Sequence, residues 1–353
     1  MTNFIQLHLL TSYPPANLNR DDLGRPKTAV MGGVQRLRVS SQSLKRAWRT
    51  CDIFAEKLKG HLGIRTKEMG AVVLGKLSSA GIPDVDAMVW AQAIAGRFGK
   101  LKAGEEKIEQ LAHFSPVESE AIDKLTATII ADRRAPREEE LDQLLQCSHT
   151  AADIALFGRM LAANPSFNTE AAAQVAHAIT VHKVAVEDDF FTAVDDLNRG
   201  IEDMGAGHMG ETAFAAGLFY LYLCVDCNLL LRNLQGDTQI TALTLRALTE
   251  AAAKVAPTGK QNSFASRAYA SYILAEKGAR QPRSLSVAFL KPIAGSDMLN
   301  DAVAALEDTR MKMDTVYGKL WQEEMTINAA RGEGSFEELL KFVARLPETE
   351  AAQ

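Results

Sequence analysis

A run of cations at helical spacing is the feature of this sequence best suited to binding anions. Residues 39–58, VSSQSLKRAWRTCDIFAEKL, have the period of an amphipathic helix, which we predict from Ser41 to about Leu58. At about 100° per residue, four polar side chains fall within roughly 100° of arc. These are Gln42, Lys45, Arg46 and Arg49. Such a face offers a cation at each turn, which suits a row of phosphodiesters.

The residues around this helix strengthen the prediction of an anion track. Ser40 and Ser41 can cap the helix and leave free N–H groups, a common phosphate site. Residues 20–49 hold eight basic and two acidic residues, whereas the whole chain has a net charge of −5. A concentrated basic segment on an acidic body indicates a confined anion-binding surface. An ordinary solvated basic face is the alternative interpretation. The basic residues are Arg20, Arg25, Lys27, Arg36, Arg38, Lys45, Arg46 and Arg49.

The composition is typical of a globular protein and predicts neither a cofactor nor a metal. The chain has 353 residues, with 47% apolar and 24% charged. No apolar run is long enough to cross a bilayer, so we expect a cytoplasmic protein without membrane contact. Cys224 and Cys227 form a CxxC, but no second pair or nearby His completes a metal set. We interpret them as buried thiols.

The coarse order of elements predicts an α+β fold. Removing a helical insertion at 60–150 leaves strand, helix, strand, strand, helix, strand, the ferredoxin-like or RRM-like arrangement, whose sheet often binds RNA. Residues 172–183 fit a helix or a strand equally well, and the acidic segment that follows is expected to project as a loop. The other predicted elements are strands at 1–10, 34–40, 216–231 and 263–275 and helices at 238–255 and 298–330.

Several segments in order resemble one known family. NRDD, RVSSQSLKRAWR, DIALFGRM, VAHAITVH, DDFFTAVDDL, GAGHMG and GKQNSFAS look like CasC-type subunits of the Cas7 family. Those subunits bind the guide RNA (crRNA) and form the backbone of the type I-E CRISPR Cascade complex. The resemblance covers most of the chain except much of 60–148 and the C-terminal stretch. No single segment is specific, but their shared order is.

The resemblance implies a hand-like architecture and a set of partners. The palm would be 1–59 and 151–353, the helical fingers 60–150, and the protruding thumb about 184–212. Copies would stack into a helical filament along the guide RNA, while base pairing with target DNA supplies specificity. The other implied partners are the large, small, belly and guide-processing subunits and, indirectly, a recruited nuclease-helicase in antiviral defence.

The resemblance also implies roles for individual residues. Aromatic or thioether surface would replace the stacking lost where a base is displaced. The residues expected to bind RNA are Arg20, Lys27, Ser40, Gln42, Lys45, Arg46, Arg49 and Met160. The thumb residues expected to fill the gap beside a displaced base are Phe190, Phe191 and Val194.

Two other classes of function compete with this interpretation. Acidic clusters at 21–22, 187–189 and 195–196 could hold Mg²⁺, which would make a metal-dependent RNA endonuclease backbone as in type III complexes. The chain lacks the glycine-rich aspartate loop typical of that activity, so we predict no enzyme. His177 and His182 are interpreted as core or surface residues. A purely structural oligomer is the third class, and the basic helix and thumb argue against it.

Overall fold

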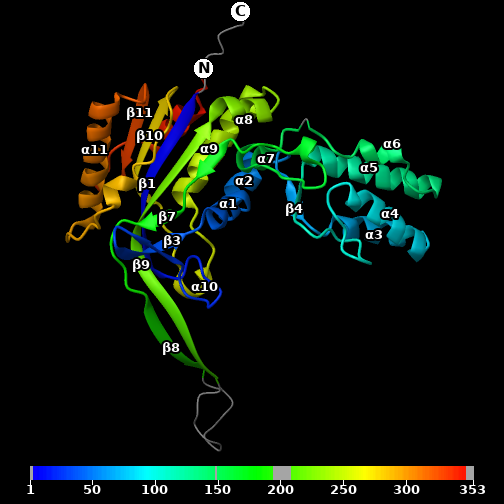
Figure 1. Ribbon diagram of the computed structural model, residues 1–353, viewed down its shortest axis with the longest axis horizontal. Helices are drawn as coiled ribbons and strands as arrows, with labels where there is room; N and C mark the ends of the chain where they lie inside the picture. The colour runs from blue at the N-terminus through cyan, green and yellow to red at the C-terminus, as the bar shows by residue number, and fades with distance from the viewer. Residues whose placement is uncertain (1–2, 148, 194–207, 347–353) are drawn as a thin grey trace, which may run out of the picture. The chain divides into compact units, whose positions relative to one another are not determined.

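The computed structural model describes residues 3–147, 149–193 and 208–346 of the chain, which is drawn in Figure 1. The chain divides into two compact units. The first comprises 1–51, 175–224 and 248–343, and the second comprises 52–174, 225–247 and 344–353. The bounds predicted for palm, fingers and thumb stay a prediction.

A nine-stranded sheet is the main feature of the first unit. Its order is β11-β10-β1-β9-β7-β3-β2, and β6 and β8 also pair with β9. The strands are β1 (Phe4–Ala16), β2 (Thr28–Met31), β3 (Val34–Val39), β6 (Ala173–Val175), β7 (Ala178–Thr180), β8 (Glu187–Ala193), β9 (His208–Asp226), β10 (Ala270–Gly278) and β11 (Glu323–Asn328). Four of these strands lie side by side in the order β10-β1-β9-β7. Numbered by their order in the sequence, they are the fourth, first, third and second of the four. The predicted α+β class is confirmed.

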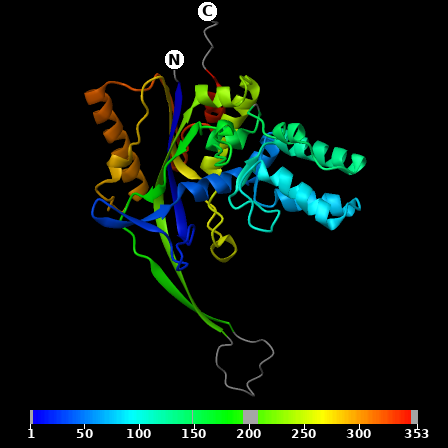
Figure 2. The same cartoon turned by 45° about the vertical axis from the view of Figure 1, so that its right-hand side comes forward.

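Helices cover both faces of this sheet. Residues 5–11 of β1 are buried without interruption, the pattern of a strand covered on both sides. Leu10, Tyr272 and Leu274 pack in a buried cluster with Leu306 of α11 (Met298–Tyr317). Figures 1 and 2 show α11 and α1 (Ser41–Arg49) on opposite sides of the sheet. The other helices of this unit are α10 (Gln261–Phe264), η2 (Ser286–Phe289), η3 (Ala329–Arg331) and most of α12 (Phe336–Ala344).

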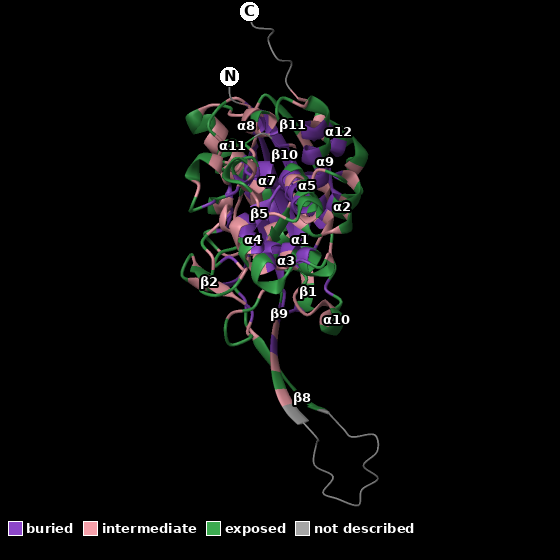
Figure 3. Cartoon of the chain, turned by 90° about the vertical axis from the view of Figure 1, so that its right-hand side faces the viewer, coloured by how far each residue is buried: buried purple, intermediate pink, exposed green. Residues whose placement is uncertain are grey.

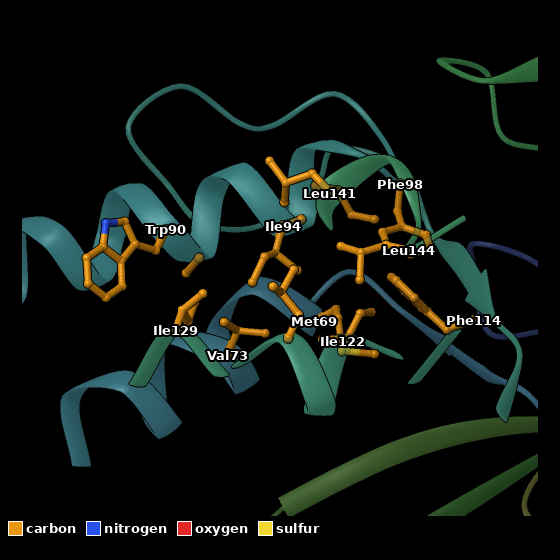
Figure 4. Close-up of a cluster of buried hydrophobic side chains, with 14 of the residues drawn as sticks. Met69, Val73, Trp90, Ile94, Phe98, Phe114, Ile122, Ile129, Leu141 and Leu144 are labelled. Carbon is orange, nitrogen blue, oxygen red and sulfur yellow. The ribbon is translucent and has the colours of Figure 1, made fainter. Parts of the chain in front are cut away.

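The second unit is mainly helical, as the sequence predicts for 60–150. Figure 4 shows its core, where side chains such as Val73, Ile94, Phe114 and Ile122 meet. A capping box at Ser115 starts its longest helix. Its elements are α2 (Asp52–Lys57), β4 (Ile64–Thr66), α3 (Met69–Ser79), α4 (Asp84–Gly96), β5 (Ala112–Phe114), α5 (Pro116–Asp132), α6 (Glu138–Asp142), α7 (Ala152–Phe157), η1 (Pro165–Phe167) and α8 (Cys227–Asn233). Helix α9 (Thr238–Lys254) runs from this unit into the first.

The helix predicted from Ser41 to about Leu58 is wrong in its length. Helix α1 ends at Arg49, and α2 starts at Asp52. The Thr50 hydroxyl donates to the carbonyl of Arg46 at 2.9 Å. That bond competes with the helical ladder, an effect known for Ser and Thr side chains. The cations therefore lie on a helix of nine residues.

Three other predicted elements need correction. The helix expected at 298–330 ends before Gly318, whose φ is 82°, and β11 follows it. The strand expected at 216–231 ends at Asp226, whose side chain caps α8. Cys227 is therefore the first residue of a helix, and its thiol, like that of Cys224, is buried. The strand expected at 263–275 begins only at Ala270.

The ambiguous segment 172–183 forms the short strands β6 and β7. The segment expected to project as a loop is instead built on a hairpin, in which β8 pairs antiparallel with the first residues of β9. Its phenylalanines and threonine favour a strand, although its acidic composition suggests a loop. Figures 1 and 3 show the hairpin extending from the sheet, with β8 largely exposed. Val194 lies outside the described residues.

Candidate nucleic-acid interface

Helix α1 presents the predicted polar face to solvent. Its buried side is formed by Leu44, Ala47 and Trp48. On the other side Gln42 and Arg46 are exposed. The remaining two residues of that face, Lys45 and Arg49, are half-buried. Partial burial lowers the pKa of Lys45.

Ser40 caps this helix, as its sequence position predicts. Its hydroxyl accepts a hydrogen bond from the N–H of Ser43 at 3.3 Å, and its own N–H donates to Asn19 Oδ1 at 2.9 Å. The Asn19 carbonyl accepts from the N–H of Lys27 at 2.8 Å. One asparagine thus ties Lys27 to the start of α1. Asn19 was not predicted from the sequence, although it stands beside Arg20 in the NRDD segment.

Arg20 lies in a turn built by Asp21. The carboxylate oxygen Oδ1 of Asp21 accepts from the N–H groups of Leu23 and Arg25 at 3.0 and 2.9 Å. Because backbone N–H groups already donate to that oxygen, we assign Asp21 the role of stabilising the turn. Among the described acidic residues considered for metal binding, Asp188 pairs with Arg25 at 2.9 Å. Asp195 and Asp196 lie outside the described residues.

Two hollows adjoin Arg20. One of about 460 Å³ is lined by Asn19, Arg20, Ser43 and Gly259, among others. The other, about 400 Å³, includes Arg20, Arg25, Asp188 and Lys260. A Cβ at Gly259 would lie 2.3 Å from the carbonyl oxygen of Leu18, so only glycine allows this approach.

Lys260 is therefore a candidate cation that the sequence analysis missed. Its ammonium group donates to the hydroxyl of Thr212. The segment GKQNSFAS was noted for its resemblance only, because no local pattern predicts that Lys260 and Arg20 line the same hollow. The signal that could have found it is the Gly-Lys pair in a turn-rich stretch.

Arg36 does not belong to this surface, contrary to the sequence interpretation. Its side chain is completely buried. It donates to the carbonyls of Thr180 and Phe289 at 3.0 and 2.8 Å and to that of Met31 at 3.4 Å. Burial lowers the pKa of this guanidinium. Arg36 joins the β2–β3 hairpin to neighbouring segments and is a structural residue.

Phe190 and Phe191 are neighbours on β8 and so point to opposite faces of the hairpin. Phe190 is 66% exposed. Phe191 is 42% exposed, and its ring lies where a Cβ at Gly210 would sit, 2.4 Å from Cζ. The register pairs Phe191 with Gly210, which explains the glycine. The two rings therefore cannot enter one gap from the same face.

Met160, in the second unit, is held toward solvent by its neighbours. It is 73% exposed, whereas Arg159 and Leu161 are buried. Arg159 Nη1 lies 2.6 and 2.8 Å from the carboxylate oxygens of buried Glu118. The N–H of Leu161 donates to Asn168 at 2.7 Å. A hollow of about 290 Å³ adjoins Met160.

The described residues contain no group of three or more His, Cys, Asp or Glu side chains placed to hold a metal ion. Nor is any described helix both long and apolar enough to span a membrane.

Comparison with known proteins places the chain in a family. The family model of the CT1975-like protein matches residues 5–347. One similar solved chain comes from a "CRISPR RNA-guided surveillance complex, pre-nicking". It shares 30% identity and a TM-score of 0.82, covering 97% of this chain and 99% of that one. Another comes from a "CRISPR RNA-guided surveillance complex", with 27% identity, a TM-score of 0.60 and coverage of 97% and 98%.

No curated protein matches this chain. The family model spans almost all of the sequence, and the solved relatives are matched over nearly their full lengths. The chain therefore belongs to the CT1975-like family, the Cas7-type subunits related to those of CRISPR RNA-guided surveillance complexes.

Proposed function

We propose that this chain is a non-catalytic backbone subunit that holds the guide RNA of a type I-E surveillance complex. Copies assemble along the RNA, and each grips the phosphate backbone without reading its sequence. Target DNA then pairs with bases that remain accessible. The partners are those of a Cascade complex: guide RNA, further copies of this chain, and the large, small, belly and guide-processing subunits.

The observation that carries this proposal is the continuity of the basic surface in the first unit. Lys27 and the cap residue Ser40 are joined through Asn19, and the exposed face of α1 follows directly. Arg20 lines both hollows beside this surface, and one of them also includes Lys260. Cations beside the N-terminus of a helix suit a phosphodiester chain and supply no means of reading bases.

The β8–β9 hairpin is the proposed thumb. An isolated two-stranded hairpin is marginally stable in water, which favours a bound partner for this projecting element. Phe190 is the ring best placed to contact a base step, because it is the more exposed of the two. Phe191 packs over Gly210 and stiffens the hairpin. Phe190 and Val194 are thus the residues proposed to fill the gap left by a displaced nucleotide.

The second unit contributes the proposed fingers and Met160. An exposed thioether between two buried, hydrogen-bonded neighbours is an adaptable apolar side chain presented at a fixed point of the backbone. Its place in the mechanism is beside the displaced nucleotide.

A direct test is to purify the full chain and measure what it carries. Bound RNA would raise the absorbance at 260 nm, and added guide-length RNA of any sequence should convert the protein into long assemblies seen by electron microscopy. Cleavage of that RNA with added Mg²⁺, lost in Asp188→Asn, would favour the endonuclease alternative. Protein that assembles without RNA and ignores added RNA would overturn the proposal.

A further inference from the structure

One exposed histidine lies at the edge of the basic surface. His177 precedes β7, and the pairing of Val39 with Ala178 places it one residue beyond that pair, on the side of Ser40. Arg38 Nη1 donates to His177 Nδ1 at 2.9 Å. The N–H of Arg38 donates to the carbonyl of Lys27 at 2.8 Å. Arg38, His177 and Lys27 thus form one cluster.

This cluster is rich in positive charge. No described carboxylate forms an ion pair with Arg38 or Lys27. Partial burial, followed by the charges of Arg38 and Lys27, lowers the pKa of His177. Among the described residues, these two cations are the charged groups that shift the pKa of His177. Because arginine can only donate, neutral His177 accepts at Nδ1 and carries its proton on Nε2.

We propose that Arg38, His177 and Lys27 form a phosphodiester site that binds more tightly when His177 takes up a proton. The proposal rests on the proposed function, since the phosphodiester is that of a bound RNA strand. A proton on Nδ1 ends its role as acceptor and releases the Arg38 guanidinium. Protonation therefore adds a cation and frees the donors of another, and a phosphate between them satisfies both.

The proton linkage has a definite sign. A phosphate beside the ring raises the pKa of His177 relative to the unbound protein. Between the two pKa values, binding takes up a proton from solution, and RNA affinity falls as pH rises. Above both values the linkage vanishes, because the ring is neutral in both states.

The test compares wild type with His177→Gln, which keeps an acceptor for Arg38 but cannot be protonated. The full chain is titrated with a fluorescent oligouridine and with an unrelated mixed-sequence RNA at about pH 7.5 and about pH 5.8. Acidification should tighten wild type by about threefold to tenfold more than H177Q. At about pH 5.8, the slope of log affinity against log salt should be steeper for wild type than for H177Q by up to about 0.7.

Two further variants keep the result interpretable. His177→Lys places a permanent cation beside Arg38, so it should exceed wild type in affinity at about pH 7.5 and lose the excess pH dependence. His182, whose Nε2 accepts from the N–H of Leu218, is the matched control, and H182Q should retain that dependence. Equal pH dependence in wild type and H177Q overturns this inference while leaving RNA binding intact. Absence of RNA binding overturns the proposed function and this inference together.

Discussion

At the scale of single residues, buried partners decide where the exposed functional groups point. Arg159 and Met160 are adjacent, but one is sealed against Glu118 and the other faces solvent. Breaking a buried ion pair leaves an uncompensated charge and costs about 3–5 kcal/mol. Truncating an exposed side chain costs far less.

We therefore expect opposite effects from these two neighbours. Arg159→Ala should destabilise the second unit by about 3 kcal/mol or more, while Met160→Ala should change its stability by about 0.5 kcal/mol or less. Urea unfolding followed through Trp90, which lies in the core of that unit, measures both. Equal stability losses would mean that Met160 is a core residue and not a wedge.

A second buried charge makes the first unit sensitive to acid. Glu276 accepts from Arg283 at 2.5 Å and from Arg310 at 2.8 Å, and His8 Nε2 lies 3.4 Å away. Burial alone would raise the pKa of Glu276, but the nearby His8 and the hydrogen bonds from Arg283 hold it at about 2. Burial lowers the pKa of His8.

The lowered pKa values of Glu276 and His8 both make the fold less stable in acid. A carboxyl with a depressed pKa stabilises the fold above its unfolded value of about 4.3, and this contribution is lost as pH falls toward about 2. Glu276→Gln should flatten the decline of stability between these values and lower stability at neutral pH. Fluorescence of Trp321, whose ring lies 4.3 Å from Arg310, reports on this region. An unchanged acid transition in E276Q would refute the assignment.

At the scale of elements, the hairpin of β8 and β9 depends on a cross-strand contact. Phe191 lies against Gly210, where a methyl group has no room. Gly210→Ala should push the ring away and loosen the hairpin, and adding Phe191→Ala should relieve the clash. Hydrogen exchange of the β8 amides measures this, with F191A alone as control. Equal exchange in wild type and G210A would show that the ring can move without cost.

Phe190 lies on the opposite face of the hairpin from Phe191 and leads to a complementary prediction. Phe190→Ala should leave folding and assembly unchanged but weaken binding of target DNA to the guide-bound complex by about 1–3 kcal/mol, the usual value of a base–aromatic contact. Circular dichroism checks the fold, and target affinity decides the role. Wild-type affinity for target in an intact F190A assembly would exclude Phe190 from the thumb contact.

Local patterns predicted elements well where local chemistry decides them. The alternation of IQLHLL, the cap at Ser40 and the polar face of α1 all depend on neighbours in sequence. The break at Thr50 and the start of β11 were missed because helical periodicity continued through them. Asn19, Gly259 and Lys260 were missed for another reason. Their roles depend on contacts with residues far away in the chain, which no local pattern contains.

At the scale of the whole molecule, the net charge of −5 conceals a local basic surface. Sequence alone placed three cations on the face of one helix, but the basic segment around it included Arg36, which the fold buries, and omitted Lys260. The α+β class and the family followed from the order of elements and segments. The two-unit division could not be fixed from sequence, because 225–247 belongs with 52–174 despite its distance along the chain.

The central claim is that the face of α1 binds the RNA backbone irrespective of sequence. Lys45→Ala with Arg49→Ala removes two cations from it. Lys312→Ala with Lys341→Ala is the matched control, since both of these lysines are exposed and form surface ion pairs. Surface pairs of this kind contribute about 0–1 kcal/mol to stability.

The most direct measurement is the salt dependence of binding of two unrelated single-stranded RNAs to these variants and to wild type. Each lost phosphate contact should lower the slope of log affinity against log salt by about 0.7, so K45A/R49A should lose about 1.4 for both RNAs. The control pair should keep the wild-type slope. A wild-type slope in K45A/R49A would contradict the account and leave α1 as a solvated basic helix.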